Sequence, residues 1–187
     1  MGKLRQNALL TEDDINKALD SNNEQVRLTA AEHQNATEAN INKALSDNHI
    51  YVRKCAIANS NATEANINKA LDDEDKYIRN IAVLSKNITT SNINKALDDN
   101  DPYIRMAAIL ASNSSQDNIN KALDDNDVSI RVMALKHSNA TTVNIDKALN
   151  DKSAKVKLAI INHPNATEKQ KEQVISDPDV ISYLLKQ

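Results

Sequence analysis

The fold of this chain is decided by one short segment, Ile41-Asn42-Lys43-Ala44-Leu45, because it returns along the sequence at a fixed interval. Four further copies of Ile-Asn-Lys-Ala-Leu and one Ile-Asp-Lys-Ala-Leu copy keep a period of 26 residues without any insertion. The other copies begin at Ile15, Ile67, Ile93, Ile119 and Ile145. A constant period of this length indicates a repeat protein, in which each copy belongs to one supersecondary unit.

Each repeat predicts two short helices. Thr37 is a suitable N-cap for the first helix, and Ile41, Ala44 and Leu45 follow at the i, i+3, i+4 spacing of an apolar helical stripe. A polar turn then leads to a second helix. Its expected N-cap positions are Asn23, His49, Asp75, Asp101, Asp127, Ser153 and Asp179. Pro102 after Asp101 supports this boundary, because proline is favoured at the first helical position.

We therefore expect an all-α protein, a right-handed α-solenoid of six two-helix repeats with terminal caps. The whole chain, 1–187, is predicted to form a single helical-repeat domain. Residues 1–10 are expected to form an N-terminal half-unit cap and residues 11–166 the six repeats. Residues 167–187 keep the 26-residue phase, but Lys171 stands where the other repeats have the core isoleucine. Tyr183 stands at the position of the arginine column. This segment is predicted to be a divergent C-terminal cap, which a solenoid needs to close its core.

Composition narrows the possible classes of protein. The 187 residues include one Gly, three Pro, one Cys and no Trp or Phe, and the net charge is -3. So little glycine argues against multi-stranded sheets and glycine-rich nucleotide loops. One cysteine excludes an internal disulfide. No apolar run of membrane-spanning length occurs, which favours a cytoplasmic protein without a membrane role. The mild acidity argues against a nonspecific nucleic-acid binder.

Two segments carry a resemblance to a known class of repeat. Residues 162–167 read Asn-His-Pro-Asn-Ala-Thr, and residues 99–108 read Asp-Asn-Asp-Pro-Tyr-Ile-Arg-Met-Ala-Ala. They resemble the leucine-rich repeat variant family and its HEAT-like relatives, and the resemblance covers nearly the whole chain. It implies an α-solenoid but no particular function. The units here are slightly longer than is usual for that family. The iron–sulfur cluster associated with the family is not expected, because Cys55 is the single cysteine.

A column of cations is the first candidate site. It comprises Arg27, Arg53, Arg79, Arg105, Arg131 and Lys157. Such a column could bind phosphates or an acidic protein. Four of these arginines, however, have an aspartate six residues earlier: Asp47 before Arg53, Asp73 before Arg79, Asp99 before Arg105 and Asp125 before Arg131. Partly buried charges need partners. The HEAT-like resemblance implies a ladder of Asp and Arg between layers, so these residues are predicted to be structural.

Other polar columns predict structural roles rather than chemistry. Asn-x-Thr/Ser recurs from Asn35 to Asn165 and is expected to satisfy backbone groups and cap helices. His33, His137 and His163 share one repeat position but lack the further ligands of a zinc site. Cys55 is expected to fill the core. No arrangement of catalytic residues stands out from the repeat. We therefore predict no catalytic, cofactor or metal site, and no enzyme activity.

The remaining face of the second helices is the candidate binding site. It carries Tyr51, Tyr77, Leu84, Tyr103, Met106 and Leu110. In HEAT-like solenoids the second helices line the concave surface, and tyrosine is favoured at protein interfaces. The alternative is that these side chains only pack between layers. The favoured function is a non-enzymatic scaffold or adaptor that binds an unidentified protein, as a monomer or weak homodimer.

Two other functions stay open. One is nucleic-acid binding, by analogy with the HEAT-like DNA alkyl-base glycosylases, although this chain lacks tryptophan and is acidic. Its support is a column of exposed-looking lysines: Lys17, Lys43, Lys69, Lys95, Lys121 and Lys147. The other is self-association through the apolar stripe, as a structural or inhibitory module.

Overall fold

The computed structural model describes residues 10–187, and within that range the chain is entirely helical, with fourteen α-helices and no strand. The predicted all-helical repeat architecture is therefore confirmed. The helices are α1 (Glu12–Ala18), α2 (Glu24–Ala31), α3 (Glu38–Ala44), α4 (Ile50–Ala58), α5 (Glu64–Ala70), α6 (Lys76–Val83), α7 (Thr90–Ala96), α8 (Pro102–Ile109), α9 (Gln116–Ala122), α10 (Val128–Lys136), α11 (Thr142–Leu149), α12 (Ala154–Ile161), α13 (Glu168–Ile175) and α14 (Pro178–Leu184). The N-terminal half-unit expected at residues 1–10 lies outside the described residues except for Leu10.

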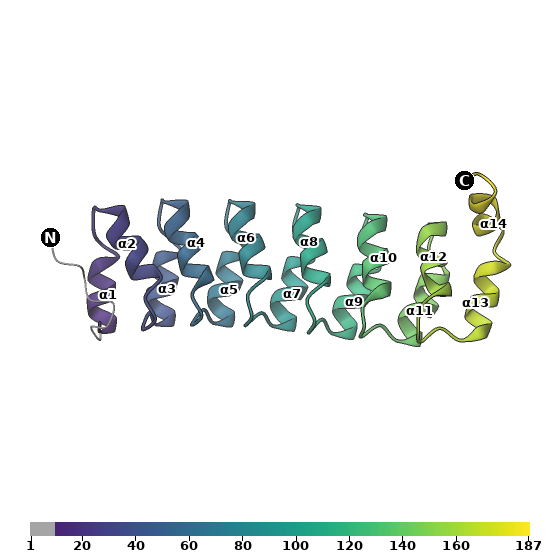
Figure 1. Cartoon of the computed structure of the whole chain (residues 1–187), viewed down its shortest axis with the longest axis horizontal. Helices are drawn as coiled ribbons and strands as arrows, with labels where there is room; N and C mark the ends of the chain where they lie inside the picture. The colour runs from purple at the N-terminus through teal and green to yellow at the C-terminus, as the bar shows by residue number, and fades with distance from the viewer. Residues whose placement is uncertain (1–9) are drawn as a thin grey trace. The chain divides into compact units, whose positions relative to one another are not determined.

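The helices form two compact units, one ending at Ile88 and the other beginning at Thr89. In the first unit, α1, α3 and α5 contact one another in sequence, and so do α2, α4 and α6 (Figure 1). In the second unit, the odd-numbered helices α7 to α13 and the even-numbered helices α8 to α14 make the same two rows (Figure 1). Each unit is thus a stack of helix pairs, as the 26-residue period predicts.

Each first helix begins at a capping box. In α5 the Thr63 hydroxyl accepts a hydrogen bond from the Asn66 N–H, and the Asn66 side-chain oxygen accepts one from the Thr63 N–H. The same reciprocal arrangement opens α1, α3, α7, α9, α11 and α13. Two of the unsatisfied N–H groups of a helix start are thereby bonded in every repeat.

The apolar stripes of both helices meet in the core. Ile67, Ala70 and Leu71 of the first helix are buried, as are Ala82 and Val83 of the second. The small residue in the Ala82 column is at most 3% exposed in every repeat from Ala30 to Ala134. A small side chain at this position lets neighbouring helices approach closely, which fixes the spacing of the stack.

The last helix starts earlier than the sequence predicts. Its N-cap is Asp177 rather than Asp179, and Pro178 occupies the first helical turn. The Asp177 carboxylate accepts hydrogen bonds from the N–H groups of Asp179 and Val180. Proline suits this position because its missing N–H has no helical partner to lose. The first helix of this repeat keeps the period, with Thr167 as its N-cap, so only α14 starts two residues early.

Candidate partner-binding face

The second helices are anchored by ion pairs between consecutive repeats. In the first unit, the Arg53 guanidinium contacts the Asp73 carboxylate of the next repeat through Nε–Oδ2 at 2.8 Å and Nη2–Oδ1 at 3.1 Å. Its third nitrogen, Nη1, donates to the backbone carbonyl of Asp47 at 3.1 Å. One planar guanidinium therefore binds two repeats at once, which a point charge such as lysine cannot do as well.

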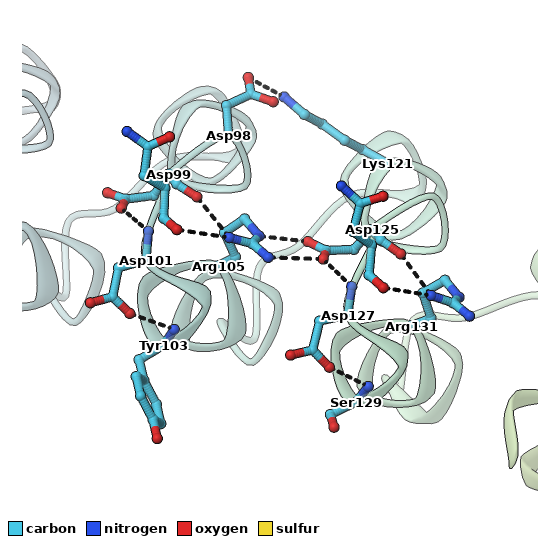
Figure 2. A network of polar contacts seen from close by, with 12 residues as sticks. Asp98, Asp99, Asp101, Tyr103, Arg105, Lys121, Asp125, Asp127, Ser129 and Arg131 are labelled. Carbon is cyan, nitrogen blue, oxygen red and sulfur yellow. Dashed lines mark hydrogen bonds and ion pairs between the residues drawn. The ribbon is translucent and has the colours of Figure 1, made fainter.

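The second unit contains the same ladder. Arg105 lies between the Asp99 carbonyl and the Asp125 carboxylate, with Nε–Oδ2 of the latter pair at 2.7 Å (Figure 2). Arg131 binds Asp151 in the same way, also at 2.7 Å. The remaining cations of the column follow the pattern within their units: Arg27 binds Asp47, Arg79 donates to the Asp73 carbonyl and Lys157 binds Asp177.

The sequence identified the right residue types but not the pairing. The aspartate six residues before Arg53 or Arg105 supplies a backbone carbonyl, whereas the carboxylate that binds the arginine lies 20 residues later, in the next repeat. Each carboxylate also accepts a backbone N–H two residues on, as Asp125 does from Asp127 at 2.8 Å. The side chains of the ladder therefore bind one another and the backbone, and so connect consecutive repeats.

The environment keeps both partners of the ladder charged. Burial by itself would raise the pKa of Asp125, but the hydrogen bonds from Arg105 and from the Asp127 N–H, together with the Arg105 charge, lower it below its ordinary value. The pKa values of Asp47 and Asp151 are lowered for the same reasons. The hydrogen bond to Asp125 raises the pKa of Arg105. At neutral pH these groups bind each other rather than a ligand.

The lysine column also connects repeats, while its side chains stay partly exposed, at 30% to 37% for Lys43, Lys121 and Lys147. Lys121 Nζ donates to the Asn94 carbonyl at 2.7 Å and contacts the Asp98 carboxylate at 2.6 Å (Figure 2). Lys43, Lys69 and Lys147 bind the equivalent carbonyls of the repeats before them. These ammonium groups lie at the C-terminal end of a neighbouring first helix, where a cation is stabilised by the helix dipole.

Asparagine forms two further ladders, of which the sequence revealed one. Asn61 of the Asn-x-Thr column donates to the carbonyls of Gln34 and Ala36 in the preceding repeat, at 2.7 and 3.0 Å. The second ladder is made by the capping-box asparagine. Asn66 is 1% exposed and donates to the Glu38 carbonyl at 3.1 Å. A Thr-x-x-Asn pattern in phase with the repeat is the signal that could have predicted it.

The histidine column caps turns. The Asn139 N–H donates to His137 Nδ1 at 3.1 Å, while His137 Nε2 lies 3.1 Å from the Ala111 carbonyl. The equivalent residue Asn59 accepts from the Asn61 N–H through its side-chain oxygen. Among residues 10–187, no group of three or more His, Cys, Asp or Glu side chains is arranged to hold a metal ion.

Cys55 is half-buried rather than a full core residue. Its thiol donates to the Glu32 carboxylate at 3.0 Å. Burial and this carboxylate raise the pKa of Cys55 to about 12. A thiol with so high a pKa is a poor nucleophile, because the thiolate is the reactive form.

In the first unit, the candidate face is exposed and hollowed. Tyr51 of α4 and Tyr77 of α6 are 58% and 68% exposed, and both line a hollow of about 510 Å³. Leu84 lies seven residues after Tyr77, two helical turns along the same face, and is 68% exposed. Lys54 and Asn80 also line the hollow. Most of the surface of Tyr51, Tyr77 and Leu84 is therefore open to solvent.

In the second unit, α8 carries the equivalent residues. Tyr103 is 73% exposed and Leu110 is 60% exposed, whereas Met106 between them is half-buried. The Tyr103 N–H is held by the Asp101 carboxylate at 2.9 Å (Figure 2). Asp101 is thus the N-cap of α8, and it stabilises the first turn of the helix, to which Tyr103 belongs.

Comparison with models of known protein families finds no match to this chain, and comparison with curated protein sequences finds no significant match. Over the part of the chain that the structure describes, no helix is both long enough and apolar enough to cross a membrane. The candidate face therefore has to be interpreted from its own residues.

Proposed function

We propose that this chain is a non-enzymatic helical-repeat protein, related to the leucine-rich repeat variant and HEAT-like families, that binds another protein. The face it uses consists of the exposed side chains of the second helices, here called the second-helix face: Tyr51, Tyr77 and Leu84 in the first unit and Tyr103, Met106 and Leu110 in the second. We also propose a cytoplasmic location, because the sequence contains no apolar run of membrane-spanning length.

The observation that carries this proposal is the exposure of tyrosine at one repeat position of the second helices and of leucine at another, seven residues later. Tyr77 and Leu84 are each 68% exposed, in a chain whose cation and asparagine columns are engaged in inter-repeat bonds. Contiguous exposed apolar side chains on a folded domain are typical of interaction sites. Tyrosine adds contact area with few rotatable bonds and a hydroxyl that can hydrogen-bond at the rim.

Nucleic-acid binding is less well supported than the sequence suggested. The lysine column was its main argument, and Lys43, Lys121 and Lys147 each contact a carboxylate and a carbonyl of the preceding repeat. A cation that is already paired gains less from a phosphate. Binding through this column would have to break those contacts.

The proposal is tested by affinity capture from a native lysate, with and without nuclease. The bait is the wild-type chain or a Tyr77→Ala/Tyr103→Ala variant, and captured proteins are quantified by mass spectrometry. We expect at least one nuclease-resistant protein whose recovery falls at least about tenfold with the variant, since aromatic anchors dominate interface energies.

A matched control is Val143→Ala on α11, because Val143 is 66% exposed but belongs to a first helix. It should leave the recovery of that protein unchanged. Recovery that depends on nucleic acid, or that is equal for wild type and the tyrosine variant, would contradict the proposed face.

A further inference from the structure

The second helices differ from the rest of the chain in charge. Helices α4, α6, α8, α10 and α12 contain no Asp or Glu, although the chain as a whole carries a net charge of -3. Two other second helices do contain an acid, Glu24 in α2 and Asp179 in α14. The remaining acidic residues of the described range lie in the first helices and in the turns. These five helices therefore add no carboxylate of their own to the second-helix face, and the acid nearest to Tyr77 is the N-cap residue Asp75.

In the first unit, a cation lies directly beside the aromatic side chains. Lys54 is exposed and lines the same hollow as Tyr51 and Tyr77, and it forms no ion pair with any residue in the described range. Lys76 Nζ lies 5.9 Å from the Tyr77 ring centroid. Lys136 and Lys155 are exposed on the second helices of the other unit.

We propose that the hollow between α4 and α6 binds an acidic peptide segment that carries large apolar side chains. The inference rests on the proposed function and specifies its partner. The peptide's apolar side chains would contact Tyr51 and Tyr77, and an adjacent carboxylate would bind Lys54. Complementary charge at the edge of an apolar contact selects partners and speeds their association.

A continuous polyanion fits this hollow less well. Asp75 forms part of its lining, and its carboxylate is held there by the Tyr77 N–H at 2.7 Å. A phosphate backbone laid along the hollow would place charge against this carboxylate at the same time as it reached Lys54. A peptide can place its acids beside Lys54 and its apolar residues elsewhere.

The test is selection of phage-displayed random 12-residue peptides on the full-length chain. We expect enrichment of sequences that combine Asp or Glu with Tyr, Phe, Leu or Ile. The strongest peptide is then titrated by fluorescence anisotropy against wild type, Lys54→Glu, Tyr77→Ala and Val143→Ala. Lys54→Glu should weaken binding by about three- to tenfold, more at low salt than at high salt. A peptide whose acidic residue is changed to lysine should instead bind Lys54→Glu more tightly than the wild type.

The possible outcomes distinguish a failure of this inference from a failure of the proposed protein-binding function. Selected peptides without acids that nevertheless depend on Tyr77 would overturn the charge inference and leave the binding face in place. Peptides that bind Tyr77→Ala as tightly as wild type would overturn both. A 20-nucleotide oligothymidylate that displaces the peptide at a lower concentration than unlabelled peptide does would assign the hollow to nucleic acid instead.

Discussion

Single asparagine side chains join the start of one helix to the start of the next. Asn40 is 2% exposed; its side-chain oxygen accepts the Thr37 N–H at 3.1 Å, and its amide donates to the Glu12 carbonyl at 3.2 Å. An amide can make both bonds because it contains a donor and an acceptor. Aspartate, with acceptors alone, could cap the helix but could not bind the preceding repeat.

Asn40→Ala should lower the free energy of unfolding by about 2 kcal/mol, because the Thr37 N–H and the Glu12 carbonyl lose their partner. Asn42→Ala is the matched control: Asn42 is an exposed residue of the same helix, and Lys69 binds its backbone carbonyl rather than its side chain. The control should change stability by no more than about 0.5 kcal/mol. Urea unfolding followed by circular dichroism measures both. Equal effects would show that the buried asparagine contributes nothing specific.

His163 introduces a pH dependence at the residue scale. Burial lowers the pKa of His163 in the folded protein, and a hydrogen bond to the Leu135 carbonyl only partly offsets this. The unfolded chain therefore binds more protons than the folded one below the ordinary histidine pKa of about 6.5. Stability should be unaffected well above that pH and should fall as the pH drops through it towards the lowered value.

His163→Asn tests this dependence, because Asn59 makes the equivalent turn bond in another repeat. The variant should lose part of the stability decrease between about pH 7 and pH 5, measured as the urea midpoint at each pH. A wild-type and variant decrease of the same size would show that His163 does not couple folding to protonation.

At the scale of the element, a helix pair is held to its neighbours by charge as well as by apolar contact. Arg131 and Asp151 have side-chain exposures of 4% and 8%, and Arg131 also binds the Asp125 carbonyl at 2.8 Å. Breaking such a pair leaves a buried carboxylate without its counter-charge.

Arg131→Met should therefore lower the free energy of unfolding by about 3 kcal/mol, most of it the cost of the unpaired Asp151. Lys136→Met in the same helix α10 is the control, because Lys136 is exposed. It should change stability by less than about 0.5 kcal/mol. The double variant Arg131→Met/Asp151→Leu should recover a large part of the loss. If it recovers none, the ladder acts through something other than paired charge.

The helices were predictable from the sequence, because the apolar spacing and the N-cap residues recur within each repeat. Ile67 and Ala70 are buried where their spacing predicts, and Thr63 caps where its side chain allows. The contacts between repeats were not predictable in the same way. Periodicity shows that Lys121 recurs but not that it reaches Asp98, because that contact depends on how closely consecutive repeats stack.

At the candidate site, too, the position of a residue within its repeat was predictable, whereas features formed between repeats were not. The sequence placed Tyr77 on the face of the second helix that lies outside the apolar stripe. It could not indicate the hollow beside it, which is formed by α4 and α6 together. The early start of α14 was missed because the fixed period was extended past the point where Pro178 resets it.

At the scale of the whole molecule, burial is supplied by the following repeat rather than by the helix pair itself. The leucine that ends each first helix is 5% exposed at Leu45, Leu97 and Leu123. Ile175, in the same position of the last repeat, is 60% exposed. Stacked repeats therefore stabilise one another within each unit.

The most direct test of the central claim, that the second-helix face binds a protein, is an isothermal titration of the captured partner with purified chain. The account predicts that Tyr77→Ala/Tyr103→Ala raises the dissociation constant by at least about tenfold, while Val143→Ala leaves it unchanged. Circular dichroism should confirm that both variants keep the wild-type helix content. Equal dissociation constants for the wild type and the tyrosine variant would contradict the account, and would place the binding site elsewhere on the chain.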